Sequence, residues 1–233
     1  MRVALLAPMQ QELRPLVTKL GLERGSGPGA HYTGHRGRIE LVASLTGIGT
    51  RAAARSAEAL LDAFAIDHAM VVGIAGSVDP AQPIGASIVP ERVVDDASGR
   101  EFRPMALDES PQRGRLVTSD RMVTDRAEAE RLRRGGVVGL DMETAAIAAV
   151  CERRGCPWSV FRAISDRVTD GTTDPAVLAL AGPDGSGSPR AVVRYLLARP
   201  WRVVRLARLA RGTYRAANGA AEAAIRGLGR LSA

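Results

Sequence analysis

The chain has 233 residues, of which 45% are hydrophobic, and this is enough for one compact domain with a buried core. No apolar run is long enough to cross a membrane, and the short apolar start of the chain lacks a small-residue cleavage site, so a cytoplasmic protein is expected. The net charge of +7 is unevenly placed, because residues 189–233 carry ten arginines and one glutamate while residues 1–188 carry a net charge of −2.

Apolar segments typical of strands alternate along the chain with segments typical of helices. The expected strands cover residues 2–8, 39–45, 69–72, 83–90 with a continuation to 94, 115–118, 137–140 and 158–164. The first helix is expected to end near Leu20, and the next three cover about 51–64, 125–134 and 142–153. Between them, residues 21–37 are a Gly-rich loop or hairpin and residues 95–113 an excursion over the surface.

The C-terminal part differs in composition from the rest. Residues 182–189 are rich in Gly, Ser and Pro and predict a flexible hinge, with two helices after it at about 190–198 and 200–217. The sequence therefore predicts an α/β domain over residues 1–181, with a central mixed, mostly parallel sheet flanked by helices, followed by a basic helical extension over residues 190–233. Ligands of such sheets bind at the carboxyl ends of the strands.

Three carboxylates stand where predicted strands end, namely Glu12, Glu143 and Asp166. A carboxylate beside a buried element costs free energy of folding unless it is paired with a partner or has a chemical role. Carboxylates at these positions therefore favour an active site. Each also has a purely structural explanation, because an acidic residue in the first turn of a helix, or at its cap, stabilises the helix. Their number, together with the convergence of strand ends, favours the active-site interpretation.

Glycine pairs at Gly47 and Gly49 and at Gly73 and Gly76 also follow predicted strands. Such glycines let backbone amides approach a phosphate or a sugar, or simply allow a tight exit from a strand. Neither pair has the spacing of a dinucleotide fingerprint or of a P-loop. The two cysteines, Cys151 and Cys156, have no second Cys or His pair near them, so reduced thiols and no metal site are expected.

Residues 1–170 resemble the nucleoside phosphorylase/nucleosidase superfamily, and in motif they are most similar to methylthioadenosine/S-adenosylhomocysteine nucleosidases. Seven segments carry the resemblance in order: Ala7-Pro-Met-Gln-Gln-Glu12, Thr46-Gly-Ile-Gly49, Gly73-Ile-Ala-Gly-Ser77, Ile84-Gly-Ala-Ser-Ile-Val89, Ser119-Asp-Arg-Met-Val123, Asp141-Met-Glu143 and Arg162-Ala-Ile-Ser-Asp166. The resemblance implies an α/β nucleosidase that cleaves the N-glycosidic bond of an adenine nucleoside without cofactor or metal. It also implies a homodimer.

The resemblance further implies roles for ten residues. Asp166 would be the general acid toward the purine N7, with Ser165 orienting it, and Glu12 would activate the attacking water. A general acid must hold a proton near neutral pH, so we expect the pKa of Asp166 to be raised by burial. Glu143 would bind the ribose hydroxyls. The remaining substrate-binding residues would be Met142 on the sugar, Val123 and Met122 at the base, and Met9, Ala75 and Gly76.

Two features of the sequence depart from the family pattern. Met122 stands where the family usually has an aromatic residue that stacks on the base, and a methionine packs on a ring less specifically. Val71 and Ile74 are apolar where phosphorolytic members hold phosphate, which favours water as the nucleophile, although an arginine from another loop or subunit could take that role.

The arginine-rich C-terminus, with Val94-Asp95-Asp96-Ala-Ser-Gly99 and Asp141-Met-Glu-Thr144, instead resembles hopanoid-associated phosphorylases, which are expected to release adenine from adenosylhopane. A basic amphipathic helix suits an anionic membrane surface, whereas the same arginines could equally form a solvated face on a helix packed on the domain. Nucleic-acid binding is the weakest explanation, because no aromatic residues are interleaved. Two further functions fit the sequence: a futalosine-type hydrolase, and a catalytically inactive nucleoside-binding or membrane-scaffold protein.

Overall fold

The computed structural model describes residues 1–26, 30–107, 112–170 and 203–231. Its helices are α1 (Gln10–Leu20), α2 (Thr50–Ala63), α3 (Arg126–Arg134), α4 (Thr144–Arg153) and α7 (Val203–Leu231), with a short 3-10 turn, η1 (Val168–Asp170). Its strands are β1 (Arg2–Ala7), β2 (Glu23–Arg24), β3 (His31–Arg36), β4 (Ile39–Leu45), β5 (His68–Ser77), β6 (Ser87–Ile88), β7 (Arg92–Asp95), β8 (Glu101–Phe102), β9 (Arg115–Thr118), β10 (Val137–Asp141) and β11 (Trp158–Arg167).

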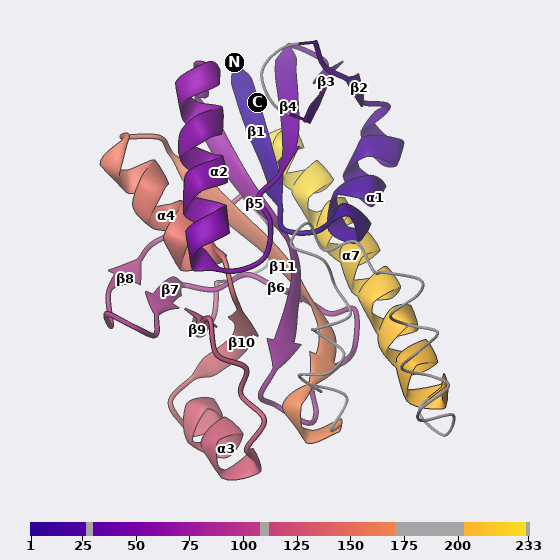
Figure 1. Ribbon diagram of the computed structural model, residues 1–233, viewed down its shortest axis with the longest axis vertical. Helices are drawn as coiled ribbons and strands as arrows, with labels where there is room; N and C mark the ends of the chain where they lie inside the picture. Colours follow the sequence, from indigo (N-terminus) through magenta and orange to yellow (C-terminus); the bar gives the residue numbers. More distant parts are fainter. Residues whose placement is uncertain (27–29, 108–111, 171–202, 232–233) are drawn as a thin grey trace.

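The strands form one mixed sheet in the order β2-β3-β4-β1-β5-β10-β9-β7-β8, and β11 also pairs with β5 in parallel and carries β6 at its other edge. Helices α2 and α4 lie on one side of the sheet and α1 and α7 on the other (Figure 1). The predicted mixed α/β architecture with flanking helices is therefore confirmed.

Buried strands supply the hydrophobic cores on the two faces of the sheet by alternation of their side chains. In β1, Ala4 and Leu6 belong to the core under α2 and α4, while Val3 and Leu5 belong to the core under α1 and α7. Successive side chains of a strand point to opposite faces, so a strand covered on both faces must be apolar at nearly every position. This explains why residues 2–7 show little polar alternation.

The structure corrects several predicted boundaries. β5 and β11 run beyond the expected ends at residues 72 and 164, because pairing between them continues through the glycines and Ser165 to Ser77 and Arg167. Residues 87–88 and 92–95 are two separate strands with different partners, and Pro90 between them has no N–H to donate to a ladder.

The C-terminal helix differs most from the prediction. It covers residues 203–231 instead of 200–217, and the expected hinge at 182–189 and helix at 190–198 lie outside the described residues. α7 packs on β11, β5 and α1, and its alanines form part of the core under α1. At Gly227 a β-carbon would lie 2.5 Å from the Phe161 ring, so small residues let this helix approach the sheet closely.

The arginines of α7 whose side chains are described lie on the exposed face of the helix, among them Arg208, Arg211 and Arg215. The opposite face, from residue 213 to residue 228, is already covered by the domain. In the described part of the chain, no helix combines the length and apolarity that a membrane span requires.

Candidate active site

A cavity of about 230 Å³ opens where strands β1, β5, β9, β10 and β11 end. Its lining combines a largely apolar wall with carboxylates and short polar side chains. All ten residues predicted from the sequence line it: Met9, Glu12, Ala75, Gly76, Met122, Val123, Met142, Glu143, Ser165 and Asp166. Strand ends that are far apart in the sequence therefore meet at one site, as expected for a sheet of this kind.

Glu12 reaches the cavity from the first turn of α1 and is almost completely buried. Its Oε2 accepts the Met9 N–H at 2.9 Å, and its Oε1 accepts the Ile74 N–H at 2.8 Å. The first bond caps the helix, so the structural and functional explanations of this residue both hold. Burial raises the pKa of Glu12 to about 7, although Arg162 and the two backbone bonds act in the opposite direction.

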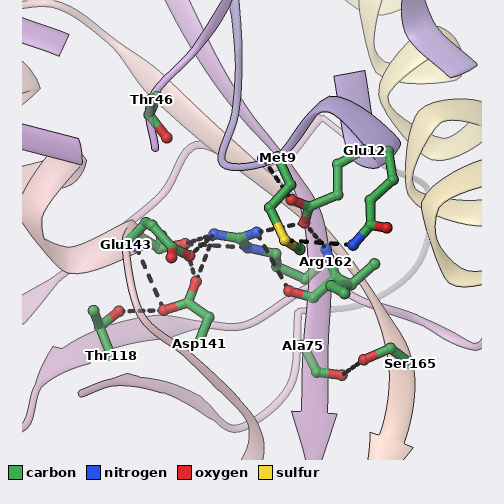
Figure 2. Close-up of polar contacts among 12 residues, drawn as sticks. Met9, Glu12, Thr46, Ala75, Thr118, Asp141, Glu143, Arg162 and Ser165 are labelled. Atoms are coloured by element: carbon green, nitrogen blue, oxygen red, sulfur yellow. Dashed lines mark hydrogen bonds and ion pairs between the residues drawn. The ribbon is translucent and has the colours of Figure 1, made fainter. Parts of the chain in front are cut away.

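Arg162 is the centre of the charged cluster, and Figure 2 shows its guanidinium between Asp141 and Glu143 on one side and Glu12 on the other. Its Nη2 lies 2.8 Å from Asp141 and 3.4 Å from Glu143, and its Nη1 lies 3.7 Å from Glu12. Burial opposes the charge of this fully buried side chain, but Asp141, Glu143 and Glu12 outweigh it and raise the pKa of Arg162.

Gly73 of β5 makes room for this cluster. A β-carbon at residue 73 would lie 2.3 Å from both Arg162 Nη1 and Glu12 Oε1. Arg162 pairs in register with Gly73 and donates to the Ile74 carbonyl at 3.3 Å. Gly73, which the sequence suggested as the exit of a strand, therefore lies inside β5, where its lack of a side chain lets Arg162 and Glu12 approach the backbone closely.

Glu143 stands at the start of α4 and faces the cavity. Its Oε1 accepts the Gly49 N–H at 3.1 Å, and Gly49 has a positive φ of 91°, a conformation that favours glycine. Burial raises the pKa of Glu143, whereas the Arg162 guanidinium acts to lower it. The glycine pair at residues 47 and 49 therefore serves a carboxylate of the site.

Asp166 and Ser165 lie at the end of β11, opposite Ala75 and Gly76 of β5. Ser165 Oγ is 2.6 Å from Asp166 Oδ1 and 3.3 Å from the Ala75 carbonyl oxygen. A β-carbon at Gly76 would be 3.8 Å from Asp166 Oδ2, an ordinary van der Waals contact, so this carboxyl lies directly beside the Gly76 backbone. Asp166 itself is only partly buried.

The loop after β9 supplies another wall of the cavity, with Val123 buried and Met122 partly exposed. Arg121, at the cavity edge, is held by Glu128 of α3 through two bonds of 2.6 and 3.0 Å. Arg121 is the one basic residue among the described residues that line the cavity. Its charge is therefore already paired with the Glu128 carboxylate.

Four residues of the site had no role predicted from the sequence: Arg162, Asp141, Thr118 and Thr144. Thr118 Oγ1 and Thr144 Oγ1 both donate to the Asp141 carboxylate, which in turn binds Arg162. Arg162 carried a usable signal, because an arginine inside the apolar run 158–164 must find buried partners. The threonines carried none, since a hydroxyl beside a strand end is common.

Comparisons with known proteins identify the family. The family model described as the phosphorylase superfamily matches residues 2–111 and 105–186. A 5'-methylthioadenosine/S-adenosylhomocysteine nucleosidase from Lysinibacillus sphaericus is 30% identical over 198 residues, which are 71% of this chain and 86% of the relative. An aminodeoxyfutalosine nucleosidase from Campylobacter jejuni is 23% identical over 201 residues, 72% of this chain and 86% of the relative.

A solved structure has the same fold. It is the 5'-methylthioadenosine/S-adenosylhomocysteine nucleosidase of Helicobacter pylori with butyl-thio-DADMe-Immucillin-A, and it matches 99% of this chain and 99% of its own with a TM-score of 0.75 and 16% identity.

Proposed function

The chain belongs to the phosphorylase superfamily, and from this premise we propose that it is a nucleosidase that cleaves the N-glycosidic bond of an adenine nucleoside. Methylthioadenosine and S-adenosylhomocysteine are the first substrates to test. The observation that carries the proposal is that Glu12, Glu143 and Asp166 line one cavity, and that Glu12 and Glu143 share the buried Arg162 as an ion-pair partner.

Asp166 is the general acid of the proposed reaction. Breaking the bond between sugar and base leaves electron density on the base, and a proton on its N7 makes the base a better leaving group. Ser165 Oγ, at 2.6 Å, holds the Asp166 carboxyl in place. A partly buried carboxyl in the lining of the cavity, beside Gly76, can reach a planar ring that enters it.

Glu12 is the group that takes a proton from the attacking water. Two backbone N–H groups fix both of its oxygens, and its pKa of about 7 makes it a base suited to neutral pH. Glu143, fixed by Gly49, binds the ribose hydroxyls. Ionised carboxylates near the sugar also stabilise the oxocarbenium-like charge that develops as the bond breaks.

Water is the nucleophile that fits the charges of this site. Val71 and Ile74 are apolar where phosphorolytic relatives hold phosphate, and Arg162, which donates to the Ile74 carbonyl, is bound by three carboxylates. Bringing a phosphate dianion to this cluster would add negative charge beside negative charge. An arginine from a neighbouring subunit could still supply a phosphate site, and phosphate dependence of the rate would reveal it.

The test is release of adenine from methylthioadenosine, S-adenosylhomocysteine and aminodeoxyfutalosine, each with and without phosphate. Asp166→Asn should lower kcat about 100-fold or more because it removes the proton donor. Asp170→Asn is the matched control, since Asp170 is exposed and lies four positions further along the chain. Tight nucleoside binding without release from any substrate would instead indicate a binding protein.

The pH profile assigns the acid. Loss of kcat on the alkaline side, abolished by Asp166→Asn, is expected of a group whose protonated form is active. A wild-type profile that falls only on the acid side would remove Asp166 from this role.

The protein acts as a homodimer in the cytoplasm, and light scattering of the purified chain measures the oligomer directly. A peripheral contact with an anionic membrane, which adenosylhopane as substrate would require, uses the exposed arginines Arg208, Arg211 and Arg215, since the apolar face of α7 from residue 213 is covered by the domain.

Vesicle co-sedimentation tests this contact. Replacing Arg208, Arg211 and Arg215 by Gln should reduce binding to phosphatidylglycerol vesicles, and replacing Arg100, Arg153 and Arg154 should not, because those arginines lie near the other face of the sheet. Equal binding by all three proteins would remove the membrane contact. Removing residues 189–233 is not a usable test, because α7 is part of the core.

A further inference from the structure

Of the three carboxylates that pair with Arg162, the carboxylate of Asp141 lies nearest to the guanidinium. The distance is 2.8 Å, against 3.4 Å for Glu143 and 3.7 Å for Glu12. Asp141 comes from the last position of β10 and is buried. The guanidinium is therefore held more closely by Asp141 than by Glu12, and Figure 2 shows it lying between these two carboxylates.

The carboxylate of Asp141 has no oxygen left for a substrate. Its Oδ1 accepts Thr118 Oγ1 at 2.6 Å and the Thr144 N–H at 3.4 Å, while its Oδ2 accepts the Thr144 hydroxyl and Arg162. Two oxygens with four donors are saturated. Asp141 therefore acts on the reaction only through the groups that it binds.

Thr144 links Asp141 to the guanidinium a second time. Its hydroxyl donates to Asp141 Oδ2 and accepts from Arg162 Nη2 at 3.0 Å and from Arg162 Nε at 3.3 Å. An arginine bound along this edge can turn toward Glu12 only by giving up several bonds. The direction of the Arg162 charge is thus set by Asp141 and Thr144.

We propose that Asp141 is a positioning residue that, by binding Arg162, prevents the guanidinium from closing on Glu12 and so leaves Glu12 basic enough to accept a proton from water. This inference rests on the proposed function of Glu12 as the base. In this arrangement one buried cation pairs with three carboxylates while Glu12 still accepts a proton. A closer Arg162 would hold Glu12 in its ionised form and weaken it as a base.

The other charges around Glu12 agree with this. Arg162 of β11 acts to lower the pKa of Glu12, and Asp141 of β10 acts to raise it. Glu143 lies on the far side of the same guanidinium (Figure 2). α7 packs on α1, but its Glu222 pairs with Lys19 at the other end of that helix.

The experiment is the pH dependence of kcat for wild type, Asp141→Asn, Thr144→Val and Thr144→Ser, with thermal unfolding to verify folding. Activity that needs ionised Glu12 falls as the pH drops through its pKa. Asp141→Asn removes the competing charge, so this acid limb should move down by about 1 pH unit, while the alkaline limb stays in place. Thr144→Val keeps every charge but loses the hydroxyl that links Asp141 to Arg162, so its acid limb should move in the same direction by a smaller amount. Thr144→Ser keeps this hydroxyl, so its acid limb should match that of the wild type.

The inference is overturned if kcat of Asp141→Asn falls at the same pH as kcat of the wild type, or at a higher pH, on the acid side. This holds whatever the maximal value of kcat. If Asp141→Asn does not fold, an unmoved limb in Thr144→Val overturns it equally. Wild-type protein that releases no adenine overturns the proposed function, and the inference with it. Wild-type release with unmoved limbs contradicts the inference alone.

Discussion

Gly212 of α7 lies against Ser165 of β11 so closely that a β-carbon at residue 212 would be 2.4 Å from the Ser165 carbonyl oxygen. Ser165 precedes Asp166 and hydrogen-bonds to it. The arginine-rich C-terminal helix is therefore in direct contact with the strand end that carries the proposed general acid. The position of α7 and the position of Asp166 therefore depend on each other.

Gly212→Ala should impair catalysis through this contact. The added methyl group meets backbone, which cannot move aside as a flexible side chain would, so either α7 or the end of β11 must shift. Overpacking of this kind costs about 1–3 kcal/mol of stability. A displaced Asp166 should lower kcat about tenfold or more, measured by adenine release.

Gly229→Ala is the matched control on the same helix, because a β-carbon there would meet nothing within 4 Å. It should leave kcat unchanged and raise stability by up to about 1 kcal/mol through helix propensity. Equal kcat for the two alanine variants would show that α7 does not position Asp166.

Glu12→Gln should inactivate the protein while stabilising it at alkaline pH. The folded-state pKa of Glu12 is raised from 4.5 to about 7, so its contribution to stability is fully present below pH 4.5 and is lost as the pH rises through 7. The ionised, buried form therefore costs up to about 3 kcal/mol at pH 8, and glutamine does not ionise. Urea unfolding at pH 8 and pH 5 should show a gain for the variant at pH 8 that becomes smaller at pH 5.

Arg162→Met should destabilise the protein by about 3–5 kcal/mol, because it leaves three buried carboxylates without their common cation. Arg153→Met is the control, since Arg153 forms an exposed ion pair with Glu58 that is worth less than about 1 kcal/mol. Chemical unfolding at pH 7 measures both. A similar small loss for the two variants would mean that the cluster around residue 162 is not held by its charges.

His68 should make the protein sensitive to mild acid. It is buried at the start of β5, its Nε2 lies 3.0 Å from Ser159 Oγ, and burial lowers its pKa from 6.5 to about 4. The unfolded chain takes up a proton below pH 6.5 that the folded chain refuses, so stability is lost as the pH falls from 6.5 to 4, by up to about 3 kcal/mol.

His68→Gln should flatten this part of the stability profile, measured by urea unfolding between pH 7 and pH 4. His35→Gln, at an exposed position, should follow the wild-type profile. A His68→Gln profile as steep as that of the wild type would assign the acid sensitivity to other groups.

The amino-acid sequence by itself determined the α/β class and the positions of the carboxylates of the site. Both follow from local features: apolar runs of strand length, helical periodicity, and acidic or glycine residues at strand ends. Because strand ends of one sheet converge, Glu12, Glu143 and Asp166 could be assigned to one place from their spacing along the chain. The sequence also predicted an arginine-rich helix near the C-terminus, but neither its end at residue 231 nor the surface that it covers.

Only the tertiary structure decided which charges meet. Arg162 comes from β11, Asp141 from β10 and Glu12 from α1, and Gly73 of β5 leaves the space in which they meet. The stability and proton affinity of a buried charge depend on the distances to its partners, and no local pattern encodes those distances. The same reason applies to α7, whose small residues face β11 and whose arginines from Arg208 onward remain exposed.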